Sequence, residues 1–120
     1  DLNSVLQKVS DLLIGGGIFA FSTPALSGVT GRWNRRLFFA QSPTDHYTIW
    51  DRWQVKKQLE QYGFTVKKIV SIGHHPERFP HAAKIRKGGF RWNILMLVSK
   101  LFKLGDSMEI YAVKQGAFDD

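Results

Sequence analysis

Apolar residues recur at helical spacing in three stretches of the sequence. These stretches cover residues 2–13, residues 51–62 and residues 92–104. In the first stretch one face is apolar and the opposite face carries polar side chains, which is the pattern of an amphipathic helix. Its apolar positions are Leu2, Val5, Leu6, Val9, Leu12 and Leu13. A glycine follows each stretch, as is typical of helix carboxyl ends, so we expect three helices.

Three further stretches have the pattern of β-strands. Residues 18–22 form a short apolar run bounded by glycines and by Thr23-Pro24. Such a run is typical of a strand covered on both faces in a parallel sheet. Residues 64–72 largely alternate apolar and polar side chains, and residues 107–114 form the last strand. The alternation of helices and strands predicts an α/β layer architecture, with a right-handed crossover between the first two, parallel strands.

The connection between the first strand and the second helix is harder to interpret. Its first part is typical of a loop because of Ser27, Gly28, Thr30 and Gly31. We expect a short helix at residues 33–40, with Trp33, Leu37 and Phe38 facing inward.

The last strand is preceded by an insertion, residues 73–105. It begins with a long loop, residues 73–90, rich in Gly, Pro, His and basic residues. The helix at residues 92–104 follows, and we expect its broad apolar face to cover the sheet. Because it is inserted before the last strand, this helix can also form a lid over a lipophilic substrate.

Length and composition fit one ordinary domain, residues 1–120, with a hydrophobic content of 43%. Cysteine is absent, which excludes a disulfide framework, a cysteine-based zinc site and a cysteine nucleophile, and suits a cytoplasmic protein. No apolar run reaches the roughly 18 residues that a membrane-spanning helix needs. The first residues lack a signal-peptide pattern and an initiating Met, so we expect a processed or excised piece of a longer chain.

The positive charge is concentrated in the middle of the chain. The formal net charge is +7, but residues 32–105 carry fifteen Lys and Arg against four Asp and Glu, a net of +11. The flanking residues 1–31 and 106–120 have net charges of −1 and −3. A basic middle can attract nucleic acid, an anionic lipid surface or an acidic substrate, or can simply be a solvated surface.

Residues 1–24 combine a helix, a glycine turn and an apolar strand that ends in Ser-Thr-Pro, and residues 46–66 run from His-Tyr-Thr through a helix to a Gly-Phe pair. This order resembles the second half of class I S-adenosylmethionine-dependent methyltransferases. In that family a Leu-x-x-Gly-Gly turn feeds the fifth strand and a Gly-Phe pair starts the sixth. Residues 106–114 are similar to the closing seventh strand, which runs antiparallel between those two. The resemblance covers roughly residues 1–72 and 106–114.

The resemblance implies a partial Rossmann-like sheet, made of the last three strands of a methyltransferase with flanking helices. The family binds S-adenosylmethionine with a Gly-rich loop after the first strand and an acidic residue at the end of the second. Neither feature is present, because Gly15, Gly16 and Gly17 precede a strand, whereas a nucleotide-binding turn follows one. We therefore expect the substrate-side half of a methyltransferase, whose partner is the missing amino-terminal half. The isolated chain is expected to be inactive and to bind the cofactor weakly.

The same resemblance places the methyl acceptor near the segments that follow the strands. The candidate substrate-binding residues are Thr23, Pro24, Arg32, His46, Tyr47, Trp50, His74 and His75. His46 follows the first strand, at the rim where α/β sheets bind ligands, so it can contact a substrate, transfer a proton or cap the next helix. The identities of the acceptor and of a catalytic base stay open.

Other kinds of site have weaker support in the sequence. His74 and His75 with His81 invite a metal site, but their spacing is loose and Glu77 is the one acidic residue nearby. Serine hydrolysis lacks a Gly-x-Ser-x-Gly turn, and glycoside hydrolysis lacks a suitable pair of carboxylates.

Two binding functions without catalysis remain as alternatives. Arginines stand beside aromatic residues, as at Arg32-Trp33 and Arg91-Trp92, which suits single-stranded nucleic acid, although such rings also build cores. The helix at residues 92–104 has a wide apolar face and ends near lysines, which suits a membrane surface. The chain could therefore be a basic nucleic-acid-binding or membrane-surface module.

Overall fold

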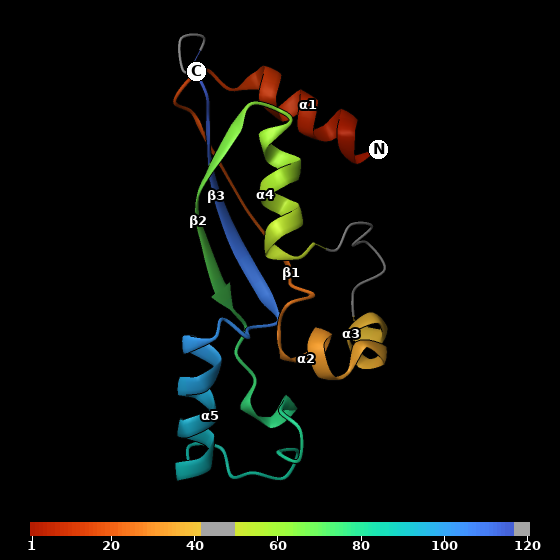
Figure 1. Cartoon of the computed structure of the whole chain (residues 1–120), viewed down its shortest axis with the longest axis vertical. Coiled ribbons are helices and arrows are strands. Elements are labelled where there is room, and N and C mark those ends of the chain that lie inside the picture. The colour runs from red at the N-terminus through yellow and green to blue at the C-terminus, as the bar shows by residue number, and fades with distance from the viewer. Residues whose placement is uncertain (42–49, 117–120) are drawn as a thin grey trace.

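The computed structural model describes residues 1–41 and 50–116 (Figure 1). It confirms an α/β chain with three strands and several helices. In chain order the elements are α1 (Leu2–Leu12), β1 (Ile18–Pro24), α2 (Val29–Trp33), α3 (Arg35–Gln41), α4 (Arg52–Glu60), β2 (Phe64–Ile72), the 3-10 turn η1 (Pro76–Arg78), α5 (Phe90–Leu101) and β3 (Ser107–Lys114).

The sheet has the order β1-β3-β2, and β3 is antiparallel to both neighbours. Phe21 lies opposite Ile110, and Ile110 in turn lies opposite Ile69. The two outer strands therefore run in the same direction without touching each other. The expected parallel direction of the first two strands is confirmed, and β3 lies between them. The position of the last strand between the other two agrees with the prediction.

One face of the sheet carries the hydrophobic core. Helices α1 and α4 contribute Leu6, Val55 and Leu59 to this core, which lies against the sheet. The fully packed strand residues on this face include Phe64, Met108, Ile110 and Ala112. The two helices also contact each other, since the Gln58 amide donates a hydrogen bond to the Asn3 side chain at 3.1 Å. The periodic apolar positions predicted the buried side of α4 correctly. For α1 the prediction holds for Leu6 and in part for Leu2, Val9 and Leu13, but Val5 and Leu12 are 56 and 71% exposed and were wrongly placed on the buried side.

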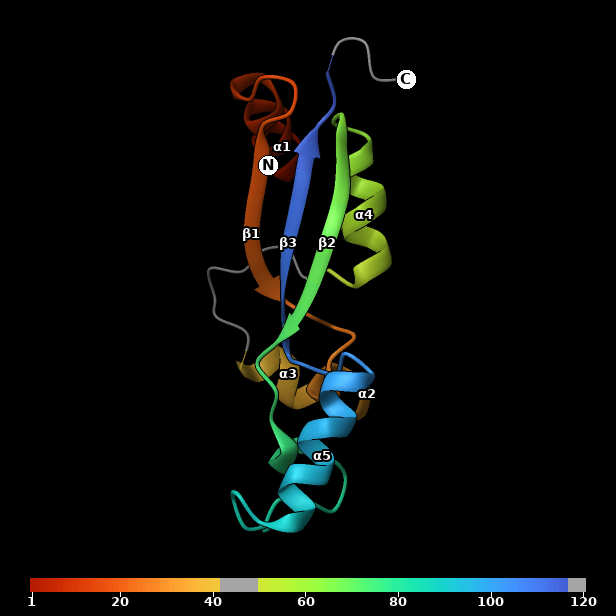
Figure 2. The same ribbon diagram turned by 90° about the vertical axis from the view of Figure 1, so that its left-hand side faces the viewer.

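The other face of the sheet is not covered by a described helix, and Figure 2 looks onto it. Every second residue of β1 points to this side, and Ile18 is 65% exposed. Its register partner Val113 is half-buried, and the neighbouring Tyr111 is exposed. The expectation of a first strand covered on both faces is therefore wrong. Residues 18–22 are apolar throughout, but only alternate side chains enter the core.

Helix boundaries follow local capping interactions. Asp1 caps α1 by accepting a hydrogen bond from the Asn3 backbone, and the helix is ended by Leu13 in extended backbone. The positive φ of Gly16 belongs to the following turn, which the bond from Gly17 N to Ile14 O closes. At α4 the Asp51 carboxylate accepts bonds from the backbones of Trp53 and Gln54, and the Gln54 side chain completes a capping box. The two helices therefore begin where an aspartate satisfies the first free N–H groups.

Residues 25–41 differ from the expectation. Thr30 and Gly31 belong to helix α2, not to a loop, and α3 starts at Arg35. Phe38 is buried as predicted, but Trp33 is 52% exposed and was wrongly placed inward. The helical signal is weak here because α2 is only five residues long.

Helix α5 does not cover the sheet. It lies beyond the end of the sheet, below β2, where its main contacts are with η1 (Figures 1 and 2). It begins at Phe90, two residues before the predicted start, and ends at Leu101. The sequence pattern identified the helix but placed it against the wrong partner.

The molecule is elongated, with principal extents of 53 × 27 × 17 Å. Its radius of gyration of 16.7 Å exceeds the value of about 13.6 Å expected for a compact domain of this length. Within the described residues, none of the helices has both the length and the apolar character needed to cross a bilayer.

Candidate functional site

The carboxyl ends of β1 and β2 lie at the same end of the sheet, because the two strands run in the same direction. At this end Pro24 and Ile72 both lie opposite Ser107, one on each side of the first residue of β3. The chain leaving these strands builds a lobe from α2, α3, η1 and α5 (Figure 1). The carboxyl ends of strands are where open α/β sheets place ligands, so this lobe is the candidate site.

A buried carboxylate joins the parts of the lobe. Asp106 is 9% exposed and precedes β3 directly. It accepts hydrogen bonds from the Thr30 backbone at 2.9 Å, from the Thr30 hydroxyl at 2.5 Å and from the Arg78 guanidinium at 2.5 Å. A charge taken out of water needs such partners to be tolerated. Asp106 therefore ties the start of α2 and the turn η1 to the central strand.

The lobe contains an apolar groove between α2, the chain after η1, and α5. The groove has a volume of about 300 Å³, and its lining residues are Arg32, Trp33, Phe79, Val98, Phe102 and Leu104. The Trp33 and Phe79 rings face each other with centroids 5.8 Å apart. The Arg32 Nε donates to the Ser27 carbonyl at 2.8 Å, which holds this guanidinium beside the rings. The groove can accept an apolar or aromatic group next to a positive charge.

The consecutive histidines His74 and His75 contact different residues. His74 is half-buried, and its Nδ1 lies 2.6 Å from the Ser99 hydroxyl while its Nε2 lies 3.2 Å from the Ser71 carbonyl. His75 is near the surface, and its Nδ1 lies 3.1 Å from a Glu77 carboxylate oxygen. Ser99 is fully buried, so the His74–Ser99 pair joins α5 to the end of β2 and does not expose a nucleophile.

A metal centre is not formed by the part of the chain that the structure describes. No three potential His, Asp or Glu ligands gather there. His81, the third member of the sequence cluster, is exposed on the loop before α5. His74 and His75 make the separate contacts described above.

Three further candidate residues, Thr23, Pro24 and Trp50, lie near the end of β1. Thr23 is buried on the core face, and Trp50 is paired with Ala25 and packs edge-on against Phe21 with centroids 5.6 Å apart. Trp50 therefore supports the strand end. His46 and Tyr47 lie outside the described residues.

The structure thus divides the sequence candidates into three places. Thr23, Pro24 and Trp50 lie at the end of β1, Arg32 lies in the groove, and His74 and His75 lie beside η1. The sequence did not indicate the roles of Asp106, Arg78 and Phe79. The sequence contains one feature that could have drawn attention to Asp106, which is the first acidic residue after a long basic stretch.

The acidity of Tyr111 is perturbed by a neighbouring carboxylate. The Tyr111 hydroxyl donates to Glu109 Oε2 at 2.6 Å. This hydrogen bond and the negative charge of Glu109 raise the pKa of Tyr111 above its ordinary value. The pair lies on the uncovered face of the sheet, away from the lobe.

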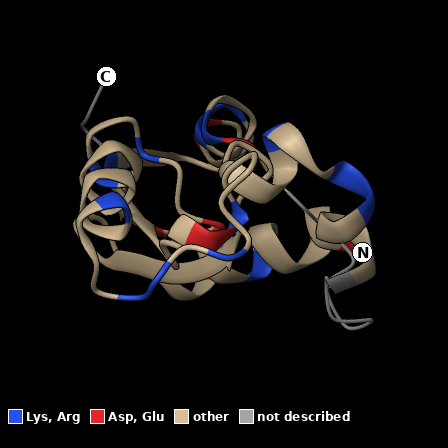
Figure 3. Ribbon diagram, turned by 90° about the horizontal axis from the view of Figure 1, so that it is seen from below, with Lys and Arg blue, Asp and Glu red and all other residues tan. Residues whose placement is uncertain are grey.

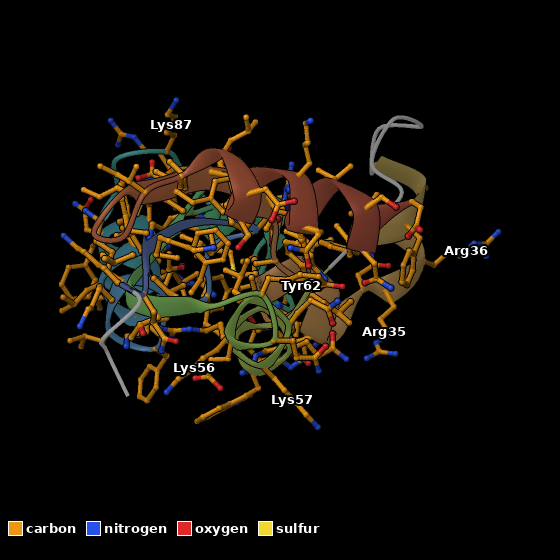
Figure 4. All side chains as sticks on the ribbon, turned by 90° about the horizontal axis from the view of Figure 1, so that it is seen from above. Arg35, Arg36, Lys56, Lys57, Tyr62 and Lys87 are labelled. Atoms are coloured by element: carbon orange, nitrogen blue, oxygen red, sulfur yellow. The ribbon has the colours of Figure 1, made fainter. Side chains whose placement is uncertain are left out.

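The labelled basic side chains of α3, α4 and the loop before α5 point to different sides of the molecule (Figure 4). Arg35 and Arg36 on α3 project outward at one side of the molecule, and Lys56 and Lys57 on α4 project from another (Figure 4). Lys87 points outward on a third side. A groove that follows a nucleic-acid backbone needs cations along one path, which these residues do not provide.

Comparison with known proteins finds no matching family model and no matching curated protein. The function must therefore be inferred from the fold and the lobe.

Proposed function

We propose that this chain is the substrate-side half of an S-adenosylmethionine-dependent methyltransferase, in which the lobe receives the methyl acceptor. The observation that carries the proposal is the sheet order. An antiparallel last strand, β3, lies between two outer strands that share one direction. This is the arrangement that the resemblance to the family led us to expect for its last three strands.

The exposed surfaces of the sheet support the same proposal. β1 pairs on one side with β3, and its other edge has no strand partner among the described residues. One face of the sheet is also uncovered, and the exposed Ile18 lies where this face meets that edge. Apolar edge strands are normally paired or protected, so further strands of the same domain would fit here.

The chain's own residues do not fit the cofactor. The backbone N–H groups of the glycine turn before β1 already have partners. Gly16 N donates to Lys114 O at 2.8 Å, and Gly17 N donates to Ile14 O at 2.9 Å. The turn also lies at the opposite end of the sheet from the lobe. The cofactor would therefore be held by the missing half, and this chain would contribute acceptor binding. Positioning the acceptor is the main catalytic task that the proposal leaves to it.

The groove is the part of the lobe best suited to the acceptor. Trp33 and Phe79 offer ring faces, and Arg32 offers a positive charge at the same place. An apolar or aromatic acceptor with an anionic group would match these features. His74 is held by two hydrogen bonds on the other side of the lobe, so it supports the end of β2 in this proposal.

Calorimetric titration with S-adenosylmethionine tests the proposal in two arms. The 120-residue chain should show no micromolar binding, whereas the product of the complete reading frame that contains it should bind one equivalent. Micromolar one-site binding by the 120-residue chain would contradict the assignment of the cofactor to the missing half. Absence of binding by the complete product would contradict the methyltransferase assignment. Arg32→Ala in the complete product should leave cofactor binding unchanged and raise the KM for the acceptor.

A further inference from the structure

Helix α5 has an apolar stripe that faces away from the rest of the molecule. The stripe consists of Phe90, Ile94, Leu97 and Leu101, whose side chains are 81, 44, 58 and 66% exposed. Their spacing of four, three and four residues places all four on one line along the helix. Ser99, which is fully buried, lies on the opposite side. The exposed stripe is thus directly opposite the side by which α5 packs onto the lobe.

Cations border this stripe on both sides. With about 100° of rotation per residue, Arg91 lies about 90° to one side of the stripe and Lys100 about 90° to the other. Both are exposed. The loop before the helix and its carboxyl end add Lys84, Arg86, Lys87 and Lys103. Residues 78–105 contain no Asp or Glu, and Figure 3, seen from the α5 end, shows no acidic position on this helix.

A second copy of the chain is a poor occupant for this stripe. Two copies joined through α5 would bring Arg91, Lys100 and the neighbouring cations of each chain together without an acidic residue from residues 78–105 to neutralise them. Like charges placed together at an interface cost several kcal/mol. The missing half of the sheet is also a poor occupant, because the resemblance implies that it would pair with β1, whereas α5 lies under β2 on the other side of β3 (Figures 1 and 2).

We propose that α5 docks this protein on an anionic lipid surface. The stripe would enter the boundary between headgroups and acyl chains, and the bordering cations would contact anionic headgroups. Helices with one apolar side and a basic surround bind membranes in this orientation. Each Lys or Arg near an anionic surface adds about 1 kcal/mol, so the charge of residues 84–103 is large enough to matter. The proposal does not depend on the methyltransferase assignment.

Cosedimentation with vesicles tests the docking. The chain should bind vesicles of phosphatidylserine and phosphatidylcholine, bind pure phosphatidylcholine far less, and be released by added salt. Lys100→Glu should weaken binding at least about fivefold, from the loss of one cation. Leu97→Ser should weaken it about tenfold, from the loss of one inserted side chain. The matched controls on α1 are Lys8→Glu and Leu12→Ser, which alter an exposed cation and an apolar side chain that is 71% exposed.

A fluorescent label locates the contact and separates docking from damage to the fold. The chain has no cysteine, so Leu97→Cys can be labelled at one place with an environment-sensitive dye. The dye emission should shift to the blue on anionic vesicles, whereas a label at Trp53→Cys, on an exposed part of α4, should not change. Circular dichroism should show the same helix content for all variants in solution.

Several results would overturn the proposal. Equal binding to neutral and anionic vesicles, or equal losses for the α1 controls, would show that α5 is not the docking element. If the chain sediments with vesicles but the emission of the dye at position 97 does not shift, α5 is likewise not the docking element. Binding to duplex DNA without binding to anionic vesicles would assign the basic surface to nucleic acid. No binding to either partner at low salt would also contradict the docking.

Discussion

At the residue scale, Asp106 connects more of the chain than any sequence signal around it indicates. Its carboxylate joins Thr30, which is 76 residues away in the sequence, and Arg78, which is 28 residues away. Asp106→Ala should lower the free energy of unfolding by about 3 kcal/mol, because it removes three hydrogen bonds and leaves the Thr30 backbone and Arg78 without their partner. Urea unfolding followed by circular dichroism measures the loss.

A double-mutant cycle separates the ion pair from the cap of α2. Arg78→Ala alone should cost less than Asp106→Ala, since Arg78 is more exposed and Thr30 keeps both of its bonds. In the Arg78→Ala background, Asp106→Ala should cost less than in the original chain. Additive losses would show that Asp106 and Arg78 act independently and would contradict the network.

Tyr111 and Glu109 give a prediction for alkaline pH. Glu109→Gln should lower the pKa of Tyr111 towards its ordinary value of 10.0, because it removes the hydrogen bond to the carboxylate and the negative charge, both of which favour the protonated phenol. Since the folded pKa is raised, the pair's contribution to stability is present below the unfolded pKa and is lost as the pH rises through the folded pKa. Titration of the tyrosine ring carbons by NMR measures the shift. An unchanged pKa in Glu109→Gln would show that the pair does not form in solution.

Sequence reasoning at this scale succeeded only for local contacts. The aspartate at position 51 was expected at the start of a helix, and it does cap α4. The partners of Asp106 and His74 could not be predicted, because each depends on how distant segments fold back onto the end of the sheet. The described candidate residues, which were chosen by their position along the chain, therefore lie in three places, at the end of β1, in the groove and beside η1.

At the element scale, glycine allows the chain segments at the end of the sheet to approach closely. A Cβ on Gly105 would lie 2.0 Å from the Ile72 carbonyl oxygen, and one on Gly28 would lie 2.3 Å from the Gly105 carbonyl oxygen. Gly105→Ala should therefore lower the free energy of unfolding by about 3 kcal/mol, since backbone must move to make room. The matched control is Gly89→Ala, whose Cβ would lie 3.2 Å from the Arg86 carbonyl oxygen.

Chemical unfolding of both glycine variants provides the comparison. Gly89→Ala should cost less than about 1 kcal/mol, because α5 begins at an exposed end of the lobe where the chain can shift. Similar losses for the two variants would contradict the tight junction between the ends of β2 and β3.

The pattern of apolar residues predicted the elements better than their surroundings. Helix α4 buries the side that its periodicity indicated, and α1 does so in part, with Leu6 buried but Val5 and Leu12 exposed. The prediction that α5 covers the sheet and the prediction that β1 is covered on both faces were wrong for the same reason. The pattern shows on which side of an element the apolar side chains lie, but it does not show whether another part of the chain covers that side. Both elements expose apolar side chains, such as Leu97 and Ile18.

At the scale of the whole molecule, β1 and β2 are the edge strands of the sheet, and the outer edge of β1 has no strand partner among the described residues. Lys114 N donates to Gly17 O, and Ala25 N donates to Asp106 O. These bonds at the two ends indicate that the odd-numbered residues of β1 form the bonded pairs with β3, because bonded positions alternate in an antiparallel pair. The N–H groups of the even-numbered residues, including Ile18, then point to the free edge. The elongated shape and this edge are what a partial sheet would show.

Proline substitution distinguishes a free edge from an internal position. Ile18→Pro should cost less than about 1 kcal/mol of unfolding free energy, because its N–H has no partner on the β3 side. Val113→Pro should cost about 3 kcal/mol or more, because Val113 lies opposite Thr65 in the central strand, next to the bond from Gln115 N to Gly63 O. The pair is well matched, since Ile18 and Val113 are register partners. Urea unfolding of the 120-residue chain gives both values.

The same substitution then tests what lies beside β1. If the methyltransferase proposal holds, Ile18→Pro should be tolerated in the 120-residue chain but should destabilise the complete product, where a neighbouring strand would need this N–H group. Equal tolerance in both would show that no strand pairs there. A large loss already in the 120-residue chain would show that the edge is occupied, as in a dimer joined through β1, and analytical ultracentrifugation would detect that dimer. The free edge therefore links the structure of this chain directly to the missing half that the proposed function requires.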